Sequence, residues 1–119
     1  VVLVHTGYPY HREAGYLANV LPRVYCDLSE GIPFAGHGAR RIIAETLEMA
    51  PLTKVMYGSD GFSIPEIDYT SAKLGKQALS EALQELVDGG MLGNADAREV
   101  GGMILAENAR RLYGIDGAL

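Results

Sequence analysis

The sequence predicts an α/β protein built on a parallel sheet. Three short apolar runs rich in Val, Leu or Tyr alternate with longer segments of helical periodicity, in the order β-α-β-α-β-α-α. The apolar runs do not alternate cleanly between polar and apolar residues, which is typical of strands buried on both faces. Strands that alternate with helices are joined by right-handed crossovers, so the three strands belong either to a doubly wound sheet or to part of a (β/α)8 barrel.

The first half of the chain contains two predicted strands and two predicted helices. Residues 1–5, Val-Val-Leu-Val-His, predict the first strand, and residues 23–28 the second. Residues 12–21 and 39–50 carry apolar residues at helical spacing, and each segment is followed by a proline that ends the helix. The glycine-rich residues 31–38 also contain Ile and Phe, and we expect them to form an ordered loop over a strand end.

The second half contains one predicted strand and two long predicted helices. Residues 54–58, Lys-Val-Met-Tyr-Gly, predict the third strand. Residues 71–87 carry a stripe of Leu and Val on one face and are stopped by a Gly-Gly pair. The last helix is expected at residues 96–112, with Asp96 as its N-terminal cap and a glycine as its stop.

Composition limits the class of protein. The 119 residues fit one compact domain, and 48% of them are hydrophobic, enough for a core. The formal charge of -5 argues against partners such as nucleic acids or membrane surfaces, which require clustered Lys and Arg. A single cysteine, Cys26, fits a reducing cytoplasm. Because the chain opens inside an apolar strand, we expect it to be a piece of a longer protein.

Polar side chains follow each predicted strand. His5 ends the first strand, Asp27 and Ser29 end the second, and Ser59 and Asp60 follow the third. Parallel strands point their carboxyl ends to one edge, so these side chains are expected to converge. Imidazole and carboxylate are ligands of a catalytic zinc or a related divalent ion, and they also serve as acid and base in hydrolysis. The alternative is structural: each carboxylate caps a turn, and the histidine bonds to backbone.

Other candidate residues lie outside the strand ends. His37, between glycines, is expected either to reach a ligand or to sit at a helix N-cap. Arg40 and Arg41 can hold a substrate carboxylate or form a solvated helix face. Tyr8 either lines a pocket or packs, and His11 is expected to be solvated.

Four stretches together resemble a known superfamily. They read Val-Leu-Val-His-Thr-Gly, Val-Tyr-Cys-Asp-Leu-Ser, Val-Met-Tyr-Gly-Ser-Asp-Gly and Glu-Asn-Ala-Arg-Arg-Leu-Tyr-Gly-Ile. Over residues 1 to 115 they resemble the C-terminal part of the metal-dependent amidohydrolase superfamily, in the branch called amidohydrolase 2 or amidohydrolase-related. Tyr-Pro-Tyr, His-Gly and Ile-Pro-Glu, beginning at residues 8, 37 and 64, are similar to the amidohydrolase portion of nodulin-like proteins fused to a glutamine-synthetase-like domain.

The resemblance implies a TIM (β/α)8 barrel, of which residues 1–119 would be the C-terminal portion: about three βα units and a closing helix. His5 would be the sixth-strand histidine beside the metal, which polarises or protonates substrate. Asp60 would be the eighth-strand carboxylate, which binds the metal and shuttles a proton. His37 would overhang the pocket from the loop after the seventh strand, residues 23–28.

The first five strands of such a barrel are missing from these residues, and with them the His-x-His pair and the fifth-strand histidine. A divalent metal, zinc in the first place, would therefore be held only in part. We expect the fragment alone to be inactive and to expose two sheet edges. We also expect it to form a homo-oligomer or to pair with the missing barrel half.

The function implied by the resemblance is metal-dependent hydrolysis of a C–N bond in a small-molecule substrate. The bond would be an amide, with γ-glutamyl amides as one class because of the fused relatives. Metal-activated water would attack, Asp60 would transfer the proton, and His5 would stabilise the oxyanion, while His37, Arg40, Arg41 and Tyr8 would bind substrate. Three alternatives stay open: a non-oxidative decarboxylase of the same fold, a non-catalytic binding or assembly barrel, and a small free-standing α/β domain.

Overall fold

Three parallel strands form the centre of the molecule in this computed structural model, which describes residues 1–29 and 31–115. They are β1 (Val2–Leu3), β2 (Tyr25–Asp27) and β3 (Val55–Met56), in the order β1-β2-β3. Leu3 pairs with Cys26, and Cys26 pairs with Val55, so consecutive strands are neighbours with all carboxyl ends at one edge. The predicted α/β class with parallel strands is confirmed.

The strands are shorter than the apolar runs that predicted them. β1 ends at Leu3 because a 3-10 turn, η1 (Val4–Gly7), begins immediately after it. β3 likewise stops at Met56, although the apolar run continues through Tyr57. A 3-10 turn after β1 and irregular backbone after β3 therefore replace the last residues of the predicted strands.

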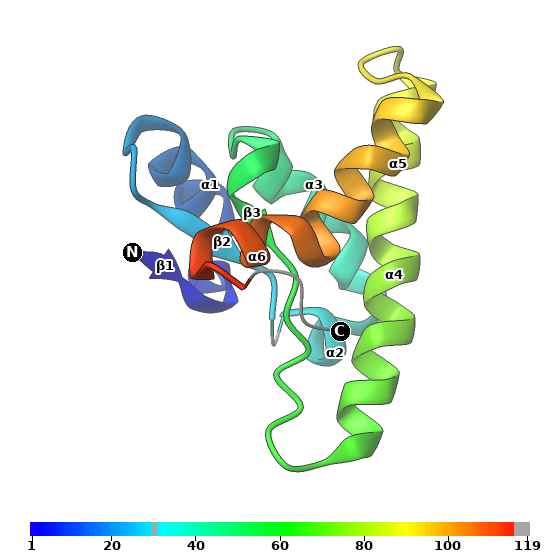
Figure 1. Cartoon of the computed structure of the whole chain (residues 1–119). Coiled ribbons are helices and arrows are strands. Elements are labelled where there is room, and N and C mark those ends of the chain that lie inside the picture. The colour runs from blue at the N-terminus through cyan, green and yellow to red at the C-terminus, as the bar shows by residue number, and fades with distance from the viewer. Residues whose placement is uncertain (30, 116–119) are drawn as a thin grey trace.

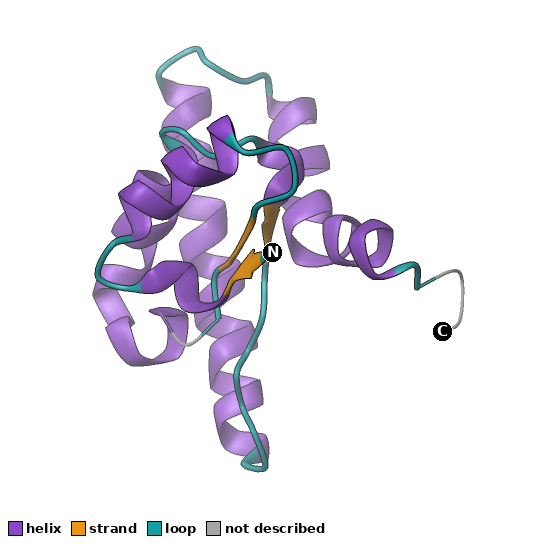
Figure 2. Cartoon of the chain, turned by 90° about the vertical axis from the view of Figure 1, so that its left-hand side faces the viewer, coloured by secondary structure: helices purple, strands orange, loops and turns teal. Residues whose placement is uncertain are grey.

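Helices cover the sheet and extend beyond it (Figures 1 and 2). Their bounds are α1 (His11–Val20), α2 (Gly31–Ala35), η2 (Gly36–Gly38), α3 (Ala39–Leu47), η3 (Leu52–Lys54), α4 (Pro65–Asp88), α5 (Asn94–Gly102), the π-helical η4 (Met103–Glu107) and α6 (Asn108–Tyr113). No helix within the described ranges is long and apolar enough to span a bilayer.

Three helical predictions need correction. Residues 31–38, expected as a loop, form the short helices α2 and η2. α4 begins at Pro65, six residues before the predicted start. Proline fits the first turn of a helix because the N–H that it lacks would have no helical partner there. The last helix begins at Asn94, and the Asp96 carboxylate accepts the Gly93 N–H from the third helical position.

The core lies between the sheet and α1, α3, α4 and α5. Cys26, at the centre of β2, is fully buried, and burial raises the pKa of its thiol to about 11. The packed residues are Ala14, Ala18, Cys26, Leu28, Ile32, Ala39, Ile43, Ala50, Val55, Ala78, Leu79, Ala82, Leu83, Val100 and Ile104. Cys26 therefore serves as a packing residue, as its apolar surroundings predict.

A polar pair joins α1 to α3. The His11 side chain is only 11% exposed, so the expectation of a solvated His11 is wrong. Its Nε2 lies 2.5 Å from Glu45 Oε2, and Arg12 Nη2 lies 3.1 Å from Glu45 Oε1. α1 also packs closely on α3 at Gly15, where an added Cβ would lie 2.6 Å from the Thr46 carbonyl oxygen. The close approach of the two helices is what buries the histidine.

The outer edge of β3 is covered by the C-terminal helices. The Tyr57 N–H donates to the Ile104 carbonyl at 2.8 Å. Asn108 is buried, and its Nδ2 donates to the carbonyls of Leu52 and Val55, each at 2.8 Å. Because the π turn η4 releases the Ile104 carbonyl from the regular helical pattern, this helix can bond to the strand. The expectation of two exposed sheet edges is therefore wrong for the β3 side.

Replacing Asn108 with Ala is expected to destabilise the protein by about 2–3 kcal/mol, because buried carbonyl oxygens would lose their hydrogen-bond donors. Urea unfolding of both variants measures the change. Asn19→Ala is the matched control: it removes an exposed amide that donates to one carbonyl, Met49, and should cost about 1 kcal/mol or less. Equal losses in the two variants would contradict the structural role of Asn108.

The His11–Glu45 pair predicts an acid-sensitive component of stability. The hydrogen bond from His11, followed by the charges of Arg12 and Arg41, holds the Glu45 pKa below its usual 4.5. A depressed folded-state pKa stabilises the fold above the unfolded pKa, and that stability is lost as pH falls through the folded pKa. Urea midpoints measured from about pH 6 to about pH 3 should therefore fall less steeply in Glu45→Gln than in the wild type.

Glu13→Gln is the control for this measurement, because it removes a carboxylate from the exposed face of α1. It should keep the wild-type slope. Parallel curves for the wild type and Glu45→Gln would refute the assigned coupling.

Candidate active site

The carboxyl ends of the three strands bring His5 and Asp60 together. His5 Nε2 lies 4.0 Å from Asp60 Oδ2, and the side chains are 34% and 40% exposed. This separation is too long for a direct hydrogen bond and short enough for both groups to touch one small ligand. The expected convergence of these two side chains is therefore observed, whereas their chemical roles remain predictions.

Unusual backbone conformations surround this pair. His5, Thr6, Asp60 and Phe62 all have positive φ, at 61°, 51°, 51° and 54°. Non-glycine residues in this left-handed region cost about 1–3 kcal/mol each and cluster at functional sites. The turns after β1 and β3 hold the two side chains toward one another at the expense of backbone strain. This observation favours a functional reading of His5 and Asp60 over the structural alternative.

Ser29 links His5 to Asp27. The Ser29 hydroxyl donates to Asp27 Oδ2 at 2.9 Å, and the Ser29 N–H donates to Asp27 Oδ1 at 2.8 Å. His5 Nδ1 lies 3.0 Å from the same hydroxyl oxygen. The Asp-x-Ser spacing is the sequence signal for the turn, in which an Asp side chain bonds the backbone two residues on. The bridge to His5 has no sequence signal, because it depends on the pairing of β1 with β2.

A cavity of about 340 Å³ lies beside His5. Tyr8 lines this cavity together with His5, as one of its two sequence-based alternatives predicts. The other lining residues come from η1 and α2 and the segments next to them: Val4, Gly7, Gly31, Phe34 and Ala35. The Tyr8 ring also stacks on the His11 ring at a centroid distance of 6.1 Å. The buried His11–Glu45 pair thus supports one wall of the cavity, a contact that sequence analysis missed.

The other predicted substrate residues lie elsewhere. His37 and Arg40 line a separate hollow between α3 and α4, and Arg40 forms an ion pair with Glu85 of α4. Arg41 is exposed on α3, close enough to Glu45 to affect its pKa. The substrate-binding roles of His37, Arg40 and Arg41 stay predictions, which this placement does not favour.

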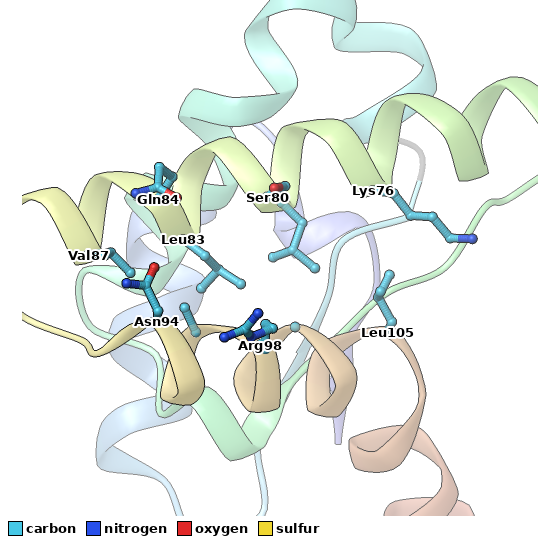
Figure 3. A pocket seen from close by; sticks show the side chains of 11 residues that line it. Lys76, Ser80, Leu83, Gln84, Val87, Asn94, Arg98 and Leu105 are labelled. Atoms are coloured by element: carbon cyan, nitrogen blue, oxygen red, sulfur yellow. The ribbon is translucent and has the colours of Figure 1, made fainter.

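A further hollow of about 330 Å³ lies between α4 and α5, on the helical layer (Figure 3). Its apolar lining includes Leu79, Leu83 and Leu105, and its charged lining residues are Lys76 and Arg98. None of the residues predicted for the site lines it. Of the hollows described above, the cavity beside His5 is the one lined by a member of the converging pair, His5, whereas Asp60 is not among its lining residues.

The side chains at the strand ends are of types that bind a divalent ion, but there are too few of them to form a complete site. At the tetrahedral angle, two zinc–ligand bonds of ordinary length place their donor atoms about 3.4 Å apart, so the imidazole nitrogen and the carboxylate oxygen, now 4.0 Å apart, would have to move closer together to share one ion. A catalytic zinc takes three protein ligands. Within residues 1–29 and 31–115, however, no group of three or more His, Cys, Asp or Glu side chains is placed to hold an ion. His5 and Asp60 can therefore form part of a metal site whose remaining ligands come from outside these residues.

Comparisons with known proteins agree with this geometry. The chain is 38% identical over 113 residues to Protein fluG from Emericella nidulans. The aligned region covers 94% of this chain and 13% of that protein. Its fold matches the crystal structure of a proposed metal-dependent hydrolase from Lactobacillus casei ATCC 334 with a TM-score of 0.89 and 36% identity. That match covers 98% of this chain and 30% of the other. The chain thus spans less than a third of the length of either relative.

The family comparison covers almost the whole chain and confirms the resemblance seen in the sequence. The family model described as Amidohydrolase matches residues 1–115, a span that includes all three strands and both His5 and Asp60. The chain therefore belongs to the amidohydrolase family.

Proposed function

We propose that the protein containing this chain is a hydrolase that cleaves the C–N bond of an amide in a small molecule, with γ-glutamyl amides as one substrate class. The observation that carries the proposal is the 4.0 Å approach of His5 Nε2 to Asp60 Oδ2 beside a cavity. Family membership and the likeness to a proposed metal-dependent hydrolase support it. The (β/α)8 barrel is proposed as the fold of the whole domain, with these strands as its last three.

Metal dependence is part of the proposal. Asp60 would be a ligand, and a divalent ion, with zinc as the first choice, would supply Lewis-acid activation of the attacking water. Because the described residues offer too few donors, we propose that this chain alone is inactive and that the rest of the barrel, or another copy, completes the site. The cytoplasmic location expected from the single cysteine remains part of the same proposal.

Each candidate residue of this chain has its own proposed role in the reaction. Asp60 would accept a proton from the attacking water and deliver it to the leaving nitrogen. His5, which faces Asp60 across the gap, would polarise or protonate the substrate. Tyr8 and the α2 side chains bound the cavity where the substrate would lie.

Two alternatives have different consequences. A non-oxidative decarboxylase of the same fold would release carbon dioxide instead of an amine, so product analysis separates the two reactions. A binding or assembly barrel would have neither activity. The strained left-handed backbone at both His5 and Asp60 is typical of active sites and of ligand-binding sites, so it favours a functional site over a purely structural domain.

Asp60→Asn should abolish metal-dependent hydrolysis by the full-length protein, because an amide cannot accept the proton and binds a metal ion poorly. We expect kcat to fall by a factor of about 10² to 10⁴, the usual contribution of a general base, or more if the ion is lost. Steady-state kinetics on an amide library, with metal content measured in parallel, provide the test. Asp88→Asn, at the far end of α4, is the control and should keep the wild-type rate. Near-normal turnover in Asp60→Asn would eliminate the assigned role.

A further inference from the structure

The segment between β3 and α4 carries Asp60 and is attached to α4 at several points. In both views it runs beside the first turns of that helix (Figures 1 and 2). Within it, Asp60 and Phe62 have positive φ, at 51° and 54°, and the Phe62 side chain is fully exposed. Residues with side chains persist in this backbone region only where the surrounding structure imposes it. The contacts that hold the segment therefore determine where Asp60 lies.

Asp68, near the start of α4, contacts the residues on both sides of Asp60. The Ser59 hydroxyl donates to Asp68 Oδ1 at 2.5 Å. Gly61 is buried, and it lies so close to the same carboxylate that an added Cβ would overlap it. The carboxylate cannot move away from such a Cβ without stretching its bond to Ser59. Asp60 is thus the residue between two points of contact with one side chain.

The same face of α4 also holds Tyr57, where the segment leaves β3. The Tyr57 hydroxyl lies 3.2 Å from Ser71 Oγ, and a Cβ added to Gly75 would lie 2.6 Å from Tyr57 Cε2. Positions 68, 71 and 75 follow one another at spacings of three and four residues, so they share one helix face. This face of α4 therefore contacts the segment at residues 57, 59 and 61, and Asp68 supplies the contacts next to Asp60.

We propose that Asp68 is a positioning residue that holds Asp60 in its left-handed conformation, with its side chain toward His5. Loss of the Asp68 carboxylate frees the Ser59 hydroxyl and opens space beside Gly61, so the turn around Asp60 can relax to ordinary backbone angles. Asp68 acts through the backbone of the turn and needs no contact with substrate. The consequence for catalysis rests on the proposed function, whereas the fixed turn does not.

Limited proteolysis of the full-length protein with chymotrypsin tests the fixed turn directly. Chymotrypsin cleaves after aromatic residues, and Phe62 is fully exposed in the middle of the segment. Cleavage requires the backbone to open locally, so its rate, followed by mass spectrometry of the fragments, measures the population of the open turn. Asp68→Ala should speed cleavage after Phe62 by about tenfold or more, the effect of losing one hydrogen bond to a charged group. An unchanged rate would overturn the proposal.

Three controls restrict the result to the contact itself. Glu66→Ala removes the same charge from the same turn of α4, so it matches any effect on the helix dipole, and it should leave the cleavage rate unchanged. Asp68→Asn, whose amide oxygen can still accept from Ser59, should stay closer to the wild type than Asp68→Ala. Cleavage after Phe34, which is 68% exposed on α2, is the internal reference. Equal acceleration after Phe34 and Phe62 would assign Asp68 to general stability and contradict the positioning role.

Gly61→Ala provides a second test, in a variant that keeps Asp68. The added Cβ collides with the Asp68 carboxylate, so this change should also speed cleavage after Phe62. In the Asp68→Ala background the collision is gone, and the same change should add little. Effects that simply multiply in the double variant would show that Gly61 and Asp68 do not act through their contact, which is the result that refutes the mechanism.

Turnover measurements separate this proposal from the proposed function. In an active hydrolase, Asp68→Ala should lower kcat by about 10- to 100-fold, since small displacements of a catalytic group are costly. KM should stay near the wild-type value, because the residues that line the cavity are unchanged. A protein that hydrolyses no amide but shows faster cleavage after Phe62 in Asp68→Ala keeps the positioning role and removes the hydrolase. A hydrolase whose cleavage after Phe62 does not respond does the reverse.

Discussion

Parallel pairing of three consecutive strands is the constraint on which the rest of the structure depends. Cys26 pairs with Leu3 on one side and with Val55 on the other, so the carboxyl ends of all three strands share one edge. His5 follows β1 by two residues, and Asp60 follows β3 by four. Reversal of either outer strand would carry its polar residue to the opposite edge. The proximity of His5 and Asp60 is thus a consequence of topology before any side-chain contact is considered.

The strand topology does not determine which way the side chains of His5 and Asp60 point. The local backbone conformation fixes their direction. The left-handed residues after β1 and β3 bend the chain sharply, and the Thr6 hydroxyl bonds the His5 carbonyl at 2.7 Å within the first bend. Such conformations persist only where surrounding structure imposes them. Here the core beneath β2 and the Ser29 bridge provide that restraint. Packing in the core below the sheet edge therefore compensates for the backbone strain at the edge.

Sequence patterns predicted the features that follow from apolar periodicity and chain order. They located three strands, four long helical segments and the convergence of His5 and Asp60. They did not predict that His11 would be buried, because its partner Glu45 lies on another helix and is brought near by close packing at Gly15. The glycine-rich composition of residues 31–38 predicts an ordered loop, yet the segment forms α2 and η2 with Ile32 buried in the core. The missed features all depend on tertiary contacts between distant segments.

The C-terminal helices act on the site through β3. The Ile104 carbonyl and the Asn108 amide bond the backbone of β3 and the residues beside it, at Leu52, Val55 and Tyr57. These bonds fix the strand that leads to Asp60, so the Asn-Ala-Arg-Arg-Leu-Tyr stretch supports the site although it lies far from it in the sequence. The same bonds occupy the outer edge of β3, and a further strand could pair there only by displacing them. The placement of Asp60 therefore depends on the C-terminal helices as well as on the sheet.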